Sequence, residues 1–163
     1  KTSLLQILAG ILPYETGKVM LQQFSLTDKR DHYLRQLVYT GHKAGIHLNL
    51  TAKENLAFLA QIYQYQDPLT LLAPLNLTAV ANQLTHTLSS GQKRRLLLAV
   101  LFMTQHKALW LLDEPMTALD QIGQDIIEKL IQQYVVNGGM VIMTSHQEIT
   151  LDQVPTERLI LCA

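Results

Sequence analysis

The chain has 163 residues, and its 13 Lys and Arg balance its 13 Asp and Glu, so the formal net charge is zero. That balance argues against a nucleic-acid-binding protein, because neutralising phosphates requires an excess of basic side chains. Hydrophobic residues make up 48% of the chain and charged residues 16%, which is typical of one globular domain and excludes a disordered chain.

No segment of the sequence is expected to cross a membrane by itself. The longest apolar run covers residues 96–103, far short of the roughly 18 residues that a spanning helix needs. A membrane protein remains possible as a partner. The one cysteine, Cys162, cannot form an internal disulfide and favours a reducing, cytosolic compartment.

The two ends favour a fragment of a longer protein. The sequence begins at Lys1 without a methionine or a signal peptide. Residues 158–163 are typical of a short buried strand, with nothing after them to complete a fold. We therefore expect truncation at both ends; the alternative is a complete small domain with frayed ends.

The N-terminal part of the chain predicts one helix and two short strands. Apolar residues recur at helical spacing over residues 1–12 and stop at Pro13, which predicts a helix. Residues 19–24 alternate weakly, as in an edge strand, and residues 37–40 form a short β-type run that ends at Gly41.

The middle of the chain, residues 51–107, is predicted to be mostly helical. Thr51 and Glu54 have the spacing of a capping box at its start. Two prolines interrupt the region, and a long helix is expected over residues 92–103.

The last third predicts two buried strands with a helix between them. Residues 108–112 form a continuous apolar run, typical of a buried strand in a parallel sheet, and residues 140–144 predict a second buried strand. Residues 124–136 predict an amphipathic helix that stops at Gly138. Because strands alternate with helices, we expect an α/β fold with a parallel sheet and a helical insert in the middle.

The sharpest motif is LWLLDEP at residues 109–115, in which an apolar strand ends in two adjacent carboxylates, Asp113 and Glu114. Ligands bind at the carboxyl ends of strands in α/β sheets. One carboxylate can hold Mg²⁺ while the other orients or deprotonates a water. Taken alone, a solvated strand end followed by a proline turn explains the motif equally well.

Lys1, Thr2 and Ser3 open the first helix and match the tail of a phosphate loop, G-x-x-x-x-G-K-[ST], whose glycines would lie before residue 1. In that loop the Lys reaches the β/γ-phosphates, the hydroxyl binds Mg²⁺, and the helix N-terminus adds partial positive charge. The dipeptide alone is equally compatible with an ordinary surface segment.

Two further segments carry polar groups suited to a nucleotide site. Ser89, Ser90 and Gly91 precede a helix and offer backbone N–H groups to an anion, although an ordinary serine cap explains them too. His146 follows the second buried strand, within reach of a γ-phosphate at the same sheet edge; a structural histidine is the alternative. The other histidines and Cys162 show no metal-ligand spacing.

These motifs occur in one order: Lys-Thr-Ser, LSSGQ, LLDEP, TALD and Ser-His. Their order and spacing, over nearly the whole chain, resemble the ATP-binding cassette (ABC) ATPases. The resemblance implies a P-loop NTPase fold with a RecA-like parallel sheet and a compact helical subdomain. Residues 1–45 and 106–163 would form the catalytic core of a single nucleotide-binding domain, and residues 46–105 the helical subdomain with the signature motif.

By this resemblance, Lys1 and Thr2 complete the phosphate-binding Walker A motif, with Ser3 beside them in the nucleotide site. Thr2 and Asp113 ligate Mg²⁺, and Glu114 is the catalytic carboxylate of ATP hydrolysis. A polypeptide of these 163 residues alone is expected to be inactive, because the Walker A glycines would precede it.

The resemblance also assigns a signature loop, Ser89, Ser90 and Gly91, which closes on ATP held by a second copy of the chain. Ser90 stands where glycine is usual, so the loop is expected to approach phosphate less closely. Asp120 would be the D-loop acid that connects the two nucleotide sites, and His146 the switch histidine that touches the γ-phosphate.

His42 stands where the family usually has a Q-loop glutamine, before the LTAKENL segment of residues 50–56. A neutral imidazole can also coordinate or hydrogen-bond, so His42 is expected in the nucleotide site with a pH-dependent charge. With residues 109–115 and 144–147, these strings are similar to a narrower group, the ATP-binding subunits of haem exporters in cytochrome c biogenesis.

The resemblance implies ATP and Mg²⁺ as ligands, a homodimer of nucleotide-binding subunits, and integral membrane subunits as partners, but no nucleic acid. The chain would lie peripherally at the cytoplasmic face of a bacterial inner membrane.

Other interpretations stay open: another small ABC exporter, a soluble ABC ATPase acting on ribosomes, or an inert fragment. A DNA-repair cassette would need a long heptad coiled coil, which the sequence lacks.

Overall fold

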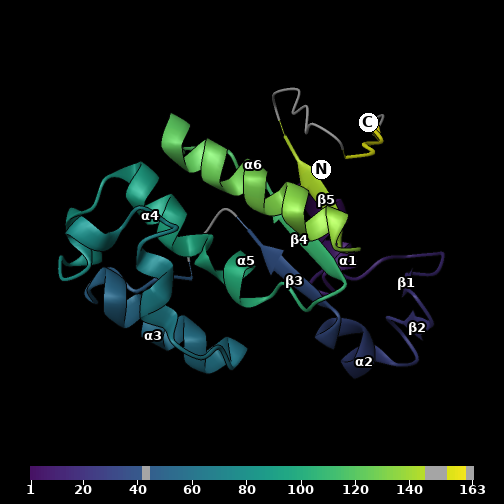
Figure 1. Ribbon diagram of the computed structural model, residues 1–163. Helices are drawn as coiled ribbons and strands as arrows, with labels where there is room; N and C mark the ends of the chain where they lie inside the picture. The colour runs from purple at the N-terminus through teal and green to yellow at the C-terminus, as the bar shows by residue number, and fades with distance from the viewer. Residues whose placement is uncertain (42–44, 146–153, 161–163) are drawn as a thin grey trace. The chain divides into compact units, whose positions relative to one another are not determined.

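The computed structural model describes residues 1–41, 45–145 and 154–160 (Figure 1). The chain divides into two compact units. The sheet unit contains residues 1–42, 106–115 and 131–163, and the helical unit contains residues 43–105 and 116–130. The boundary falls within one helix, α6 (Gln121–Val136).

The centre of the sheet unit is a parallel sheet with the strand order β3-β4-β5. The strands are β3 (Leu37–Thr40), β4 (Leu109–Asp113) and β5 (Met140–Thr144). All five residues of β4 are buried, because this apolar strand pairs on both edges. The register places Asp113 beside Thr144 at the carboxyl end of the sheet. The predicted α/β architecture with a parallel sheet is confirmed.

Helix α1 (Thr2–Leu8) packs on β4 and contributes Leu5 to the core of the sheet unit. It is shorter than the predicted helix over residues 1–12, because Gly10 adopts a left-handed conformation with φ of 69° and ends the helical geometry. The predicted edge strand is a small hairpin, β1 (Met20–Leu21) and β2 (Phe24–Ser25).

Helix α2 (Arg30–Arg35) has no counterpart in the sequence-based prediction. Its one buried residue is Tyr33, whose hydroxyl donates a hydrogen bond of 2.7 Å to the carbonyl of Leu8, the last residue of α1. A helix this short is held by tertiary packing rather than by an apolar period of its own. For this reason the pattern in the sequence did not reveal it.

The helical unit begins with α3 (Ala52–Tyr63), and the predicted capping box between Thr51 and Glu54 is present. Three short 3₁₀ helices follow in place of a longer α-helical region: η1 (Pro68–Leu72), η2 (Thr78–Val80) and η3 (Thr85–Thr87). The buried amide of Asn55 ties this region together, because it donates to the His47 carbonyl at 2.9 Å and to the Thr85 hydroxyl at 2.9 Å.

The long helix predicted over residues 92–103 is two helices, α4 (Ser90–Leu97) and α5 (Ala99–Met103). The break lies at Leu98, whose ψ of −1° departs from helical geometry. Both helices bury apolar residues in one core with α3; that core includes Leu56, Leu59, Leu75, Leu96, Ala99 and Met103.

The C-terminal part of α6 lies against the sheet. Its Tyr134 ring stacks on the Trp110 ring of β4 with centroids 3.6 Å apart, and the Tyr134 hydroxyl donates to the Lys107 carbonyl at 2.9 Å. A Cβ atom at Gly139 would lie 2.3 Å from this tyrosine ring, so only glycine fits there. The predicted stop of the helix before Gly138 is confirmed.

The predicted buried strand at residues 158–163 is wrong for its described part. Residues 154–160 have no strand structure, and Leu159 and Ile160 are exposed. An apolar run becomes a strand only where another strand offers backbone partners, and here none is described.

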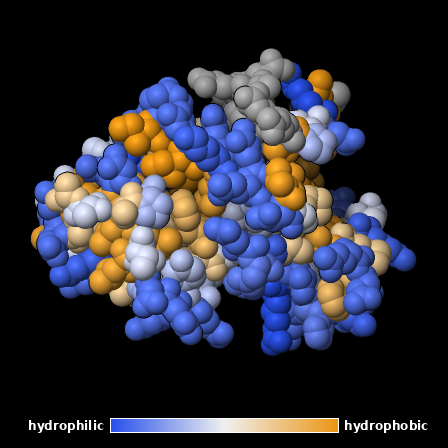
Figure 2. Space-filling model, viewed as in Figure 1, coloured by the Kyte–Doolittle hydropathy of each residue, from blue (hydrophilic) through white to orange (hydrophobic). Residues whose placement is uncertain are grey.

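Within the described residues no helix is long and apolar enough to span a bilayer. Figure 2 shows hydrophobic residues scattered among hydrophilic ones on the face that it draws.

Candidate functional site

The sheet unit brings the start of α1 to the carboxyl ends of β4 and β5. The hydroxyl of Thr2 donates a hydrogen bond of 3.2 Å to Oδ1 of Asp113, and Nζ of Lys1 donates to the Ser145 carbonyl at 3.1 Å. Ser3 is exposed in the first turn of the same helix. The first turn of α1 contains no acidic residue of its own, and the carboxylate at this helix N-terminus is that of Asp113.

Asp113 is the buried anion of this cluster, with 1% of its surface exposed. Its Oδ1 also accepts a hydrogen bond of 2.7 Å from the Thr144 hydroxyl, which the sheet register places next to it. Hydroxyl and carboxylate oxygens are the hard donors that Mg²⁺ prefers, and Mg²⁺ sites commonly use one or two protein ligands plus phosphates. The donor set of Thr2 and Asp113 therefore fits Mg²⁺.

No group of three or more His, Cys, Asp and Glu that could hold a metal ion is found within the described ranges.

Glu114 follows Asp113 in a left-handed backbone conformation with φ of 49°. A non-glycine residue in this region costs of order 1 kcal/mol or more, and such residues cluster at functional sites. The conformation is held by a hydrogen bond of 3.0 Å from the Glu114 N–H to the Thr144 hydroxyl. Thr144 thus contacts both acidic residues, a role that sequence analysis missed although it had singled out the segment that Thr144 begins.

The charge of Asp113 also acts on β3. Burial raises the pKa of Tyr39, and the nearby Asp113 carboxylate raises that pKa further. Tyr39 therefore stays a neutral phenol beside the acidic end of β4.

His42 and His146, both predicted for the nucleotide site, lie outside the described residues.

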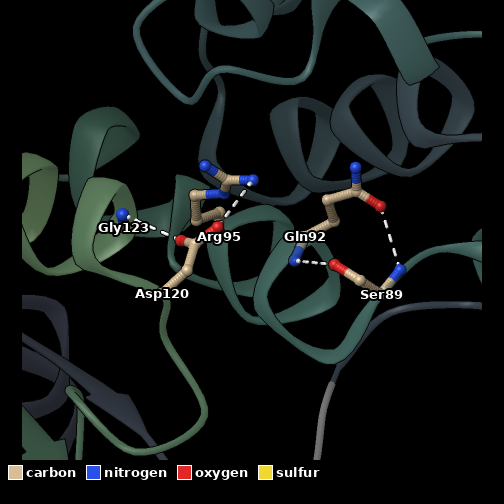
Figure 3. Close-up of polar contacts among 5 residues, drawn as sticks. All are labelled: Ser89, Gln92, Arg95, Asp120 and Gly123. Atoms are coloured by element: carbon tan, nitrogen blue, oxygen red, sulfur yellow. Dashed lines mark hydrogen bonds and ion pairs between the residues drawn. The ribbon is translucent and has the colours of Figure 1, made fainter.

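In the helical unit, the predicted signature loop forms the N-terminus of α4 (Figure 3). Ser89 is the N-cap residue: its Oγ accepts from the Gln92 N–H at 3.2 Å, and its own N–H donates to Gln92 Oε1 at 2.9 Å. Ser89 and Ser90 are exposed and Gly91 is buried. The first turn has no acidic side chain, so this helix end suits an anion.

Asp120 caps the start of α6 in the same unit. Its Oδ1 accepts a hydrogen bond of 2.9 Å from the Gly123 N–H, and its Oδ2 lies 3.6 Å from Nη2 of Arg95 on α4 (Figure 3). This cap explains why α6 begins at Gln121, earlier than predicted. Sequence analysis missed Arg95, because nothing local distinguishes it from the basic residues beside it.

The structure therefore groups the candidates by unit. Lys1, Thr2, Asp113 and Glu114 lie together at one end of the sheet, and the signature residues and Asp120 lie together in the helical unit.

The chain is similar to known proteins of one family. Residues 1–117 match the family model described as ABC transporter. The chain is 38% identical over 156 residues to a cytochrome c biogenesis ATP-binding export protein, CcmA, of Vibrio cholerae; the match covers 93% of this chain and 75% of that protein. It is 40% identical over 163 residues to CcmA of Histophilus somni, covering 98% of this chain and 75% of the relative.

Solved structures show the same fold. An ATP-binding subunit of an ABC transporter superposes with a TM-score of 0.73 at 20% identity, covering 90% of this chain and 63% of that structure's chain. The dimeric ATP-binding cassette MJ0796, bound to ADP and Pi, superposes with a TM-score of 0.72 at 23% identity, covering 90% and 69% of the two chains. The chain thus spans about two thirds of the length of these structures.

The family match and the curated relatives lead to the same assignment: this chain belongs to the ABC transporter family, as an ATP-binding subunit related to the cytochrome c biogenesis ATP-binding export proteins.

Proposed function

We propose that the protein hydrolyses ATP as the nucleotide-binding subunit of a membrane transporter, and that this transporter is the haem exporter of cytochrome c biogenesis. The observation that carries ATP hydrolysis is the cluster of Thr2, Asp113, Thr144 and Glu114 at the end of the sheet. The assignment to cytochrome c biogenesis rests on the curated relatives, which are 36–42% identical to the chain, and haem as the exported group rests on the resemblance of the motifs. Another small ABC exporter is the second candidate.

The cluster divides the work of phosphoryl transfer among its residues. Lys1 would bind the β/γ-phosphates, and the N-terminus of α1 would add partial positive charge. Thr2 and Asp113 would hold Mg²⁺, which would neutralise charge that develops on the phosphate oxygens. Positioning and charge neutralisation are most of what this reaction needs from the protein.

Glu114 is proposed as the residue that orients the attacking water. Its backbone N–H is hydrogen-bonded to the Thr144 hydroxyl, which fixes where the side chain leaves the main chain. As a base it accepts a proton of the water while the water oxygen bonds to the γ-phosphorus and the bond to the ADP oxygen breaks. The products are ADP and inorganic phosphate. His146 is proposed to contact the γ-phosphate, and His42 to take the place of the Q-loop glutamine.

The complete site is proposed to need a second copy of the chain. Ser89, Ser90 and Gly91 of one copy would close on ATP held by the other, where the open N-terminus of α4 adds partial positive charge. Asp120 would connect the two sites. Closure would drive integral membrane subunits at the cytoplasmic face of the inner membrane. They would dock near residues 42–50 and the helix that follows.

The decisive experiment replaces Glu114 in the full-length protein, purified with its membrane partners. Glu114→Gln should nearly abolish ATP turnover while ATP still binds, because the amide keeps the shape but cannot take a proton. Glu15→Gln, the same change at an exposed loop position, should leave turnover unchanged. Turnover of Glu114→Gln within about tenfold of the parent would refute the catalytic assignment.

Haem export is tested separately in cells that lack the native gene. The parent gene should restore covalent haem staining of c-type cytochromes, and Glu114→Gln should not. Normal cytochromes in the deletion strain would favour another exporter.

For a polypeptide of these 163 residues alone we propose negligible ATP binding, since no phosphate-loop glycines precede Lys1 in it. An affinity for ATP near that of an intact cassette would contradict this.

A further inference from the structure

The helical unit contains a buried cation that the proposed chemistry does not use. Arg95 lies on α4, one turn after Gln92, and 4% of its side chain is exposed. Its Nη2 faces Oδ2 of Asp120 at 3.6 Å. Its Nε and Nη1 are buried and have no hydrogen-bond partner among the described residues. Buried donors without acceptors cost free energy, so an arginine kept in such a place calls for a reason.

Asp120 is shared between two elements. Its Oδ1 accepts a hydrogen bond of 2.9 Å from the Gly123 N–H in α6, and its Oδ2 forms the ion pair with Arg95 (Figure 3). The ion pair is longer than the roughly 2.7–2.9 Å of a charge-assisted hydrogen bond. The side chain of Asp120 is 50% exposed, whereas that of Arg95 is enclosed. Arg95 is therefore the buried member of the pair, and Asp120 is the member that also faces solvent.

Two glycines let these segments approach each other. A Cβ atom at Gly91 would lie 3.5 Å from both Cγ and N of Asp120, so the signature glycine backs directly onto this residue. A Cβ atom at Gly123 would lie 2.9 Å from Oδ1 of Asp120 and 3.3 Å from Cδ of Arg95. The start of α4, residues 118–120 and the start of α6 are thus packed around one carboxylate.

We propose that Arg95 is a positioning residue, which holds the Asp120 segment to the signature helix so that the two move together. Residues 116–120 follow Glu114 and Pro115 directly along the chain. A displacement of the α4 N-terminus by ATP bound to the second copy therefore reaches, through Arg95 and Asp120, the segment that continues from the catalytic carboxylate. This inference rests on the proposed function, because it requires ATP hydrolysis in a two-copy site.

The test is a double-mutant cycle on ATP hydrolysis by the full-length protein with its membrane partners. Arg95→Gln and Asp120→Asn should each lower kcat about tenfold or more while the KM for ATP stays within about twofold, since neither residue binds the chain's own ATP. The double variant should be no slower than the slower single variant, because the first change already breaks the contact. Effects on kcat that multiply would overturn the proposal.

Controls separate positioning from folding. Arg35→Gln makes the same change at an exposed position of α2 and should alter neither kcat nor KM. Since removing one partner of a buried ion pair destabilises the fold, Arg95→Gln is checked by thermal melting. If it does not fold, the cycle uses Arg95→Lys and Asp120→Glu, which keep both charges. The same result is expected with smaller effects on kcat, and unchanged kcat in Arg95→Lys would overturn the proposal.

The proposed function can be judged separately from the positioning role of Arg95. If the parent hydrolyses ATP and Glu114→Gln does not, the catalytic assignment stands whatever the Arg95 cycle shows. If the parent is inactive with all its partners present, the proposed function fails, and the positioning role fails with it.

Discussion

Helices α3 and α4 of the helical unit begin with the same local device. At α3, the Thr51 N–H donates to Glu54 Oε2 at 2.8 Å and the Glu54 N–H donates to Thr51 Oγ1 at 3.3 Å. At α4, the corresponding distances between Ser89 and Gln92 are 2.9 Å and 3.2 Å. Both caps satisfy backbone donors that a helix N-terminus otherwise leaves open.

The two caps differ in charge. Glu54 places a carboxylate at the positive end of α3 and compensates its partial charge, whereas the amide of Gln92 keeps the same hydrogen bond and adds no charge. The comparison teaches that a capping box with a carboxylate compensates the partial positive charge of the helix N-terminus. A capping box with an amide leaves that charge available to an anion. One carboxylate-for-amide exchange separates a structural helix start from one suited to phosphate.

The largest effect is expected from exchanging the charge at α4. Gln92→Glu should keep the helix stable but lower kcat/KM for ATP about 10- to 100-fold, because a carboxylate a few ångströms from phosphate repels it by roughly 1–3 kcal/mol. The measurement is steady-state ATPase kinetics of the full-length protein. The reciprocal variant Glu54→Gln should leave kcat/KM unchanged, and equal losses in both variants would erase the distinction.

A medium effect is expected from removing the α3 cap. Thr51→Ala should lower the free energy of unfolding by about 1 kcal/mol, the usual cost of losing a threonine N-cap, without changing kcat/KM. Urea unfolding followed by circular dichroism measures the first quantity. Ser89→Ala should show a similar loss of stability together with lower activity. If Thr51→Ala also lowered kcat/KM, the α3 cap would share the function of α4.

The smallest effect concerns pH. Hydrogen bonds from the Thr51 backbone and then from its hydroxyl lower the pKa of Glu54 below its ordinary value of 4.5. The stability from this carboxylate is therefore fully present above pH 4.5 and is lost as the pH falls through the lower pKa of the folded state. Thermal melts of the parent and of Glu54→Gln should converge there. Gln92 does not titrate, so α4 contributes no such dependence, and a constant difference between the melts would contradict this account.

Sequence patterns were sufficient where one local signal dominated. The apolar runs that became β4 and β5 predicted parallel strands, and β4 is buried as predicted. The predicted burial of β5 is wrong, because Met140 is exposed and the other four residues are half-buried. The adjacent acids at the end of β4 indicated the sheet edge at which Thr2 contacts Asp113. The capping box of Thr51 and Glu54 was also evident from spacing alone. In each case the residues that carry the signal are neighbours in the chain.

Patterns failed where distant residues decide the structure. Helix α2 depends on Tyr33 reaching the Leu8 carbonyl, and the break at Leu98 divides an apolar run that reads as one helix. The pairing of Arg95 with Asp120, and the contacts of Thr144 with both acidic residues, depend on tertiary packing and sheet register. The roles of His42, His146 and the signature residues remain predictions.

The aromatic stack on β4 has a practical consequence. Trp110 is the chain's one tryptophan, is fully buried, and lies against Tyr134 three positions before Asp113 on the same strand. Its ultraviolet emission therefore comes from one defined place, close in sequence to Asp113, the carboxylate that we propose as a Mg²⁺ ligand. Excited at long wavelength, this indole provides a built-in fluorescence probe with which nucleotide arrival can be followed in real time without attaching a dye.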